Sequence, residues 1–97
     1  MPDYMMLMHD DAMSPPSNEM WASYLAKLRG AGVFDGGSSI GAGESHRQGA
    51  PAKPVSEHIA GYIRVCAAGL AEARALLTGN PVFECGGTVE IRELPSN

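Results

Sequence analysis

A histidine followed by two aspartates, His9-Asp10-Asp11, is the group of residues in this chain best suited to proton transfer. It directly follows the apolar run YMMLM, which predicts that His9 lies at the end of a strand. A histidine titrates near neutral pH, so a carboxylate that orients its ring would make it a general acid or base. Because Asp10 and Asp11 cannot both face His9, the orienting carboxylate could equally be Asp35. The alternative is a strand-terminal histidine followed by two solvated turn acids.

A second candidate group lies in the segment FDGGSS, which runs from Phe34 to Ser39. Its glycines suggest a bulge or a close approach, and they would let a ligand reach the backbone. Ser38 and Ser39 would offer hydroxyl groups to that ligand. Asp35 could then orient His9 or bind a substrate hydroxyl group. The competing interpretation, which we favour from the sequence alone, is a turn aspartate beside glycines.

His58, Tyr62 and Arg64 share one face of a predicted strand, because side chains alternate between the two faces of a sheet. Arg64 could hold the carboxylate of an anionic substrate while His58 moves a proton. The alternative, which we prefer at this level, is packing and salt bridging between two protomers at that face.

Neither the histidines nor the cysteines show the spacing of a familiar metal site. His9, His46 and His58 have no i, i+4 relation, and Cys66 and Cys85 form no C-x-x-C pair. We therefore expect no metal ion and no other cofactor.

The elements that must position these residues follow from hydrophobic periodicity and from the places of glycine and proline. The expected strands cover residues 4–9, 33–40, 58–66 and 87–94. One helix is expected from the N-cap Ser17 to about Gly30, and a second over residues 70–78. The order βαββαβ predicts a single α+β domain over residues 1–97, with a ferredoxin-like four-stranded antiparallel sheet and two helices on one face. The first strand should be buried on both faces, and residues 41–56 should form a surface loop.

The closing segment GNPVFECGGTVEIREL combines the end of a helix with the last strand. Gly79 suits a left-handed residue after the helix, and Pro81 is expected to prevent that helix from continuing. Val89 and Ile91 should point toward the helices. The opposite face of this strand would extend the polar face of the preceding strand with Thr88, Glu90 and Arg92.

Size and charge limit the possible partners. The chain has 97 residues, 44% hydrophobic content and a net charge of −4. A domain this small buries only about 60% of its unfolded surface, so self-association would stabilise it. Its basic residues are scattered, which disfavours nucleic acid as a partner. We see no signal peptide and no apolar run long enough to span a bilayer, so we expect no membrane association and a cytoplasmic location.

Several motifs occur in an order and spacing that resemble a known family: MLMHDD, AGVFDGG, SEHIAGYIRV, GLAEARALL and NPVFECGGTVEIREL. Over residues 2–94 the chain resembles the YCII-related proteins, which include the DGPF subgroup. The resemblance implies a dimeric α/β barrel and therefore a homodimer. It implies little about activity, although some relatives act on small aromatic ring compounds, for instance as a dehydrochlorinase, and a catalytic His–Asp pair has been proposed for some. Some related domains occur beside extracytoplasmic-function sigma factors.

The chain departs from this family at the signature that names the DGPF subgroup. The segment PAKPV stands at its expected position, residues 51–55. A role that depends on the aspartate of that signature is therefore not carried over to this chain.

Two functions of different classes follow from these observations. The first is a dimer that binds or acts on a small anionic or aromatic molecule, with proton transfer by His9 and Asp10 or Asp35. Its substrate-binding residues would be Ser38, Ser39, His58, Tyr62 and Arg64. The second function is a non-catalytic regulatory or protein-interaction module, for example one linked to sigma-factor regulation.

Overall fold

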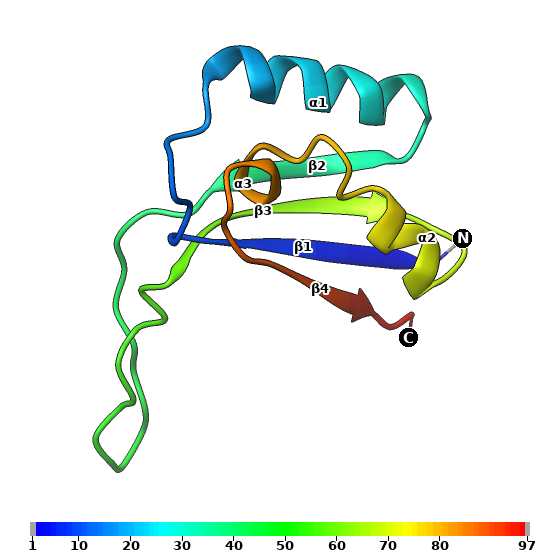
Figure 1. Ribbon diagram of the computed structural model, residues 1–97. Coiled ribbons are helices and arrows are strands. Elements are labelled where there is room, and N and C mark those ends of the chain that lie inside the picture. Colours follow the sequence, from blue (N-terminus) through cyan, green and yellow to red (C-terminus); the bar gives the residue numbers. More distant parts are fainter. Residues whose placement is uncertain (1, 97) are drawn as a thin grey trace.

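The computed structural model describes residues 2–96 and contains one four-stranded antiparallel sheet (Figure 1). The elements in chain order are β1 (Asp3–His9), α1 (Asn18–Gly30), β2 (Phe34–Ser39), β3 (Ile59–Cys66), α2 (Leu70–Ala75), α3 (Pro81–Glu84) and β4 (Val89–Leu94). The strands lie in the order β2-β3-β1-β4, and each neighbouring pair is antiparallel. The predicted α+β class and antiparallel sheet are confirmed, and the arrangement is compatible with a ferredoxin-like fold.

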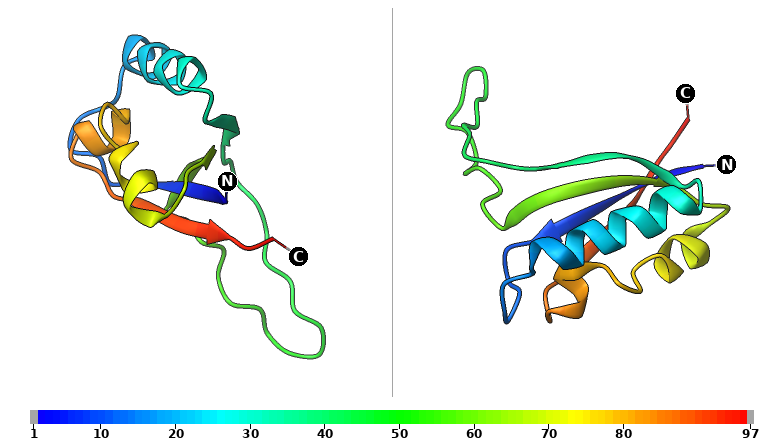
Figure 2. Two further views of the ribbon diagram at one scale, coloured as in Figure 1. Left: turned by 90° about the vertical axis from the view of Figure 1, so that its right-hand side faces the viewer. Right: turned by 90° about the horizontal axis from the view of Figure 1, so that it is seen from above.

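All three helices lie on one side of the sheet (Figure 2), and the core lies between them and the strands. The buried core residues are Tyr4, Met6, Met8, Tyr24, Leu28, Ile63, Val65, Ala67, Ala73, Leu77 and Val82. We call the other side of the sheet the open face. Strand register places on it Asp3, Met5, Leu7, His9, Tyr62, Arg64, Glu90 and Arg92.

β1 alternates between the two faces of the sheet, so the expectation that it is buried on both faces was wrong for the single chain. Tyr4, Met6 and Met8 are buried against the helices, whereas Met5 and Leu7 on the open face are only half-buried. The reason is that the helices cover one face, and nothing among residues 2–96 covers the other. The apolar run reflects the central place of β1 in the sheet.

α1 begins and ends as predicted. The Ser17 hydroxyl accepts a hydrogen bond from the Met20 amide at 3.1 Å and so satisfies one of the free amides at the helix start. Tyr24 and Leu28 are the residues that α1 buries, one turn apart on the same side of the helix. The Tyr24 hydroxyl also donates to the Leu76 carbonyl oxygen at 2.7 Å, which joins α1 to the segment after α2.

The second helical region consists of two short helices rather than one. α2 ends at Ala75, earlier than predicted, and Gly79 then adopts the expected left-handed conformation with a φ of 89°. Pro81 does not simply end a helix, because it occupies the first turn of α3. The Asn80 side chain caps α3 by accepting a hydrogen bond from the Phe83 amide at 3.1 Å. Proline is tolerated at this position because its missing amide hydrogen would have no partner there.

The remaining segments agree with the sequence prediction except at their ends. The loop of residues 41–56 is almost entirely exposed and extends away from the sheet (Figure 1). β4 is an edge strand beside β1, and Val89 and Ile91 pack against the core as predicted. His58 lies just before β3 rather than within it, which corrects the predicted start of that strand.

Candidate functional site

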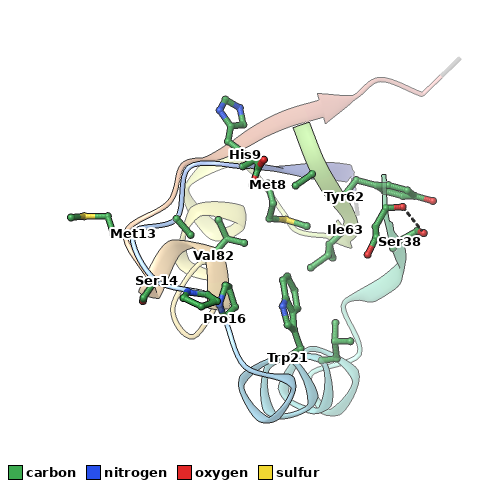
Figure 3. Close-up of a pocket in the computed structure, with 18 of the residues that line it drawn as sticks. Met8, His9, Met13, Ser14, Pro16, Trp21, Ser38, Tyr62, Ile63 and Val82 are labelled. Atoms are coloured by element: carbon green, nitrogen blue, oxygen red, sulfur yellow. Dashed lines mark hydrogen bonds between the residues drawn. The ribbon is translucent and has the colours of Figure 1, made fainter. Parts of the chain in front are cut away.

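A pocket of about 720 Å³ lies between α1 and the side of the sheet that faces the helices. The apolar side chains of Met8, Trp21, Ile63 and Val82 converge on it (Figure 3), and Leu25 of α1 also lines it. Small-molecule sites typically enclose roughly 300–1,000 Å³ and are mostly apolar with a few polar groups. The pocket therefore has the size and the lining of a site for a small organic molecule.

Glycines shape the part of this pocket where β2 pairs with β3. A Cβ atom at Gly37 would lie 2.6 Å from the Tyr62 carbonyl oxygen, so the two strands approach each other here because position 37 has no side chain. The pairing register of β2 also shifts between Phe34 and Gly37, which confirms the predicted bulge. The close approach in FDGGSS is thus made by the backbone of β3.

Three of the predicted binding residues lie at the edge of the pocket where β2 pairs with β3. Ser38, Ser39 and Tyr62 all line it, and Ser38 is the register partner of Tyr62. The side chains of Tyr62 and Ser38 lie next to each other at this edge (Figure 3), and register places both on the open face, whereas Ser39 pairs with Gly61 on the side that faces the helices. The Ser38 hydroxyl donates to the Ser39 carbonyl oxygen at 2.9 Å. The Ser39 hydroxyl is therefore the one on the same side of the sheet as Trp21, where a hydroxyl can bind a polar group of a ligand.

The imidazole of His9 points away from this pocket (Figure 3), although His9 is among the residues that line it. The ring lies on the open face, where its Nε2 and Glu90 Oε1 are 2.8 Å apart and form a hydrogen bond. This hydrogen bond is the main reason why the pKa of the Glu90 carboxyl lies below its ordinary value. The His58 ring packs edge-on against His9, with ring centroids 4.9 Å apart and an interplanar angle of 76°.

The carboxylate that contacts His9 is therefore Glu90 rather than Asp10 or Asp35, which corrects the predicted His–Asp pair. Asp35 lies beside Arg64 instead, with its Oδ2 3.5 Å from the Arg64 Nε. Asp10 is exposed and lines the pocket on the opposite side of the sheet from the His9 ring. Register explains the change, because the bulge and pairing of β1 place His9 beside the start of β4.

Arg64 is already neutralised by two carboxylates, which argues against its predicted role in holding an anionic substrate. Its guanidinium lies 3.2 Å from Asp3 and 3.5 Å from Asp35. Asp3 also accepts a hydrogen bond from the Cys66 thiol at 3.3 Å, and this contact raises the pKa of Cys66. The structure thus brings Tyr62, Ser38 and Ser39 together at the pocket but leaves Arg64 in a separate ion-paired group.

Asp11 makes a contact with Thr88 that the sequence did not indicate. Asp11 accepts hydrogen bonds from the Thr88 amide at 2.7 Å and from the Thr88 hydroxyl at 2.6 Å. These bonds, the hydroxyl bond first, hold the pKa of the Asp11 carboxyl below its ordinary value. They fasten the segment after β1 to the segment before β4, and so help to position His9 beside Glu90.

We expected no metal site because the histidines and cysteines lack the spacing of a familiar metal site along the chain. Spacing along the chain does not determine the distances between side chains in the fold. One ligand atom from each of His9, His58 and Glu90 lies within 4.8 Å of the other two. The signal that could have indicated this group is the predicted polar face, which placed His58 and Glu90 on one side of the sheet. Only the pairing of both flanking strands with β1 brings His9 between them.

No protein-family model matches this chain, and no curated protein matches it either. Among residues 2–96, no helix is long and apolar enough to cross a membrane. Two features of the fold have functional chemistry: the pocket under α1 and the histidine group on the open face.

Proposed function

We propose that this chain is a small-molecule-binding protein whose ligand occupies the pocket between α1 and the sheet. The ligand would be an apolar or aromatic molecule with one polar end. The observation that carries this proposal is the pocket itself, about 720 Å³ in volume and lined mainly by apolar side chains, with Ser39 of β2 at one edge. The resemblance to the YCII-related proteins, some of which act on small aromatic ring compounds, supports the same class of ligand.

The lining of the pocket favours an aromatic ring over a flexible chain. Trp21 and Phe34 both line the cavity, and aromatic pairs gain about 0.5–1.5 kcal/mol beyond the burial of their surface. Ser39, on the helix-facing side of β2, would hydrogen-bond the polar end of the ligand. Because the His9 ring lies on the other face of the sheet, the proposal concerns binding in this pocket and assigns His9 no catalytic step there.

Binding should be visible in the fluorescence of Trp21, because it is the one tryptophan in the sequence and it lines the pocket. We expect phenol- and benzoate-type ring compounds to change its emission. Leu25→Glu should weaken their binding at least about tenfold, or ~1.4 kcal/mol, because a carboxylate in the pocket disfavours both an apolar ring and an anionic group. Calorimetric titration would measure the affinities.

The matched control for this experiment is Ala26→Glu. Ala26 is the next residue of α1 and is exposed, so the same carboxylate would point into solvent. This variant should bind as tightly as the unchanged protein. Unchanged Trp21 emission with every ring compound, or equal weakening by the two substitutions, would contradict the proposal.

We also propose that two chains associate through the open faces of their sheets, in the dimeric α/β barrel that the resemblance implies. Met5 and Leu7 lie half-buried in the middle of this face, on the central strand. A second sheet would remove these apolar side chains from water. The Arg64–Asp3 pair lies beside Met5 and would enter the contact as an ion pair whose charges already neutralise each other.

Light scattering should therefore give a mass of about twice the 10.2 kDa of one chain. Leu7→Glu should shift the protein to the monomer, because it places a carboxylate at the centre of the apolar contact. Ser23→Glu, on the exposed surface of α1, should leave the dimer unchanged. A mass near 10.2 kDa for the unchanged protein at all working concentrations would refute the dimer.

A further inference from the structure

The histidine group on the open face has the donor atoms of a metal site. His9, His58 and Glu90 offer two imidazole nitrogens and one carboxylate oxygen, all within 4.8 Å of one another. We propose that these three residues bind a divalent transition-metal ion of the zinc type. This proposal goes beyond the pocket under α1, because the two sites lie on opposite faces of the sheet and share no ligand-binding side chain.

The distance between His9 and Glu90 is close to the one that a shared metal ion requires. Zinc bonds to nitrogen and oxygen are about 2.0–2.2 Å long, so two ligands of a tetrahedral ion lie roughly 3.3 Å apart. His9 Nε2 and Glu90 Oε1 are 2.8 Å apart and already face each other. A metal ion would take the place of the shared proton with a small separation of these two groups. The His58 ring, 4.9 Å from that of His9, completes the set by a rotation about its side-chain bonds.

Backbone hydrogen bonds hold the three ligands in place from adjacent segments. The His9 amide donates to the Thr88 carbonyl oxygen at 2.9 Å, which joins the end of β1 to the start of β4. The Asp10 amide donates to the His58 carbonyl oxygen at 2.8 Å, which joins the same end to the start of β3. The three ligands therefore need little ordering to bind an ion, because folding has already brought their backbones together.

An irregularity in strand pairing brings His58 within reach. Met8 pairs with Gly61, but His9 pairs with Ile59, so the register shifts by a bulge between these two positions. Without the shift, His58 would lie farther along the strand from the residue opposite His9. Bulges often re-aim a side chain beside a functional site, and this one places the second imidazole next to the first.

The donor set favours zinc or a similar ion over calcium or magnesium. Two imidazoles and one carboxylate suit zinc and its neighbours, whereas the harder ions prefer oxygen ligands alone. In a single chain the His9 and Glu90 side chains are 19% and 37% exposed, so an ion and further water ligands can reach the group before two open faces associate. Arg92 lies 3.5 Å from Glu90 Oε2, which leaves Oε1 as the oxygen that faces the imidazoles.

Zinc binding to the full, untagged chain would test this proposal directly. Competition with a chromogenic zinc chelator should show one ion per chain. His58→Ala and Glu90→Gln should each weaken zinc binding at least about tenfold, since each removes one of three protein ligands. His58 is exposed, so its replacement leaves the core intact, and circular dichroism would check the fold of both variants.

The chain supplies its own matched control in His46→Ala. His46 Nε2 and Glu44 Oε1 are 3.0 Å apart, but both side chains are 81% exposed and they form a pair rather than a group of three. This variant should bind zinc as the unchanged protein does. Zinc should also shift the imidazole NMR signals of His9 and His58 more than those of His46.

Three results would overturn the proposal. The first is the absence of stoichiometric zinc binding, and the second is unchanged affinity in His58→Ala or Glu90→Gln. The third is loss of the ion when Cys66 and Cys85 are both replaced by serine, which would assign the metal to the thiols. Leu25→Glu, which tests the pocket, should leave zinc affinity unchanged, so failure of either proposal can be recognised separately.

Discussion

Replacement of Ile63 by aspartate should leave the chain largely unfolded at 25 °C. Ile63 is 3% exposed, and it lies on β3 between its register partners Met6 on β1 and Gly37 on β2. An unpaired carboxylate at this position would cost several kcal/mol, and loss of the isoleucine contacts would add roughly 2–5 kcal/mol. The total is comparable to the whole stability of a small domain, about 5–15 kcal/mol.

Far-UV circular dichroism and urea denaturation would measure this effect. Ala60→Asp is the matched control, because Ala60 belongs to the same strand but is exposed. It should shift the urea midpoint only slightly. A cooperative transition of Ile63→Asp near the midpoint of the unchanged protein would show that the core is not where the structure places it.

The second large effect is expected at the turn before β4, for Gly87→Ala. A Cβ atom at Gly87 would lie 2.6 Å from Val82 Cγ1, 3.0 Å from the Val82 carbonyl oxygen and 3.2 Å from Ala12 Cα. Two of these neighbours are backbone atoms, which cannot move away as the end of a flexible side chain can. The Gly87 amide also donates to the Val82 carbonyl oxygen at 2.8 Å, so the strain falls on a contact that orients β4.

We expect Gly87→Ala to lower the free energy of unfolding by about 1–3 kcal/mol, the usual effect of overpacking. Gly30→Ala is the control, because Gly30 ends α1 and a Cβ atom there would meet no atom of the described residues within 4 Å outside its own helix and its chain neighbours. Alanine favours helix more than glycine does, so this variant should be as stable as the unchanged protein or slightly more stable. Equal denaturation midpoints for the two variants would contradict the packing of this turn.

The elements and their order could be predicted from the sequence because their signals are local. Alternation in residues 58–66 and 87–94 marked strands, and Ser17 marked the start of α1. Gly79 was correctly expected to be left-handed, since glycine has no Cβ atom to clash in that conformation. Helix boundaries were less well predicted, because Pro81 can either end one helix or begin the next, and the cap from Asn80 decides between them.

The candidate site was predicted only in part. Ser38, Ser39 and Tyr62 were identified from hydroxyl groups near glycines and on a polar strand face, and they do line a pocket. The partner of His9 was missed because it lies far along the chain, and Glu90 was recognised only as a member of a polar strand face. The pocket itself gave no sequence signal, since the apolar residues that line it look like ordinary core residues of a helix and a strand.

By itself, the sequence determined which residues form strands and helices, which strand face is polar, and that β4 begins after a pair of glycines. Hydrophobic periodicity and turn chemistry decide these features between near neighbours in the chain. Only the tertiary structure decided that His9 lies between Glu90 and His58 rather than beside Asp10 or Asp35. Strand order and the bulge beside His9 depend on contacts between distant segments of the chain. A shift of one residue in strand register would send these side chains to the opposite face of the sheet.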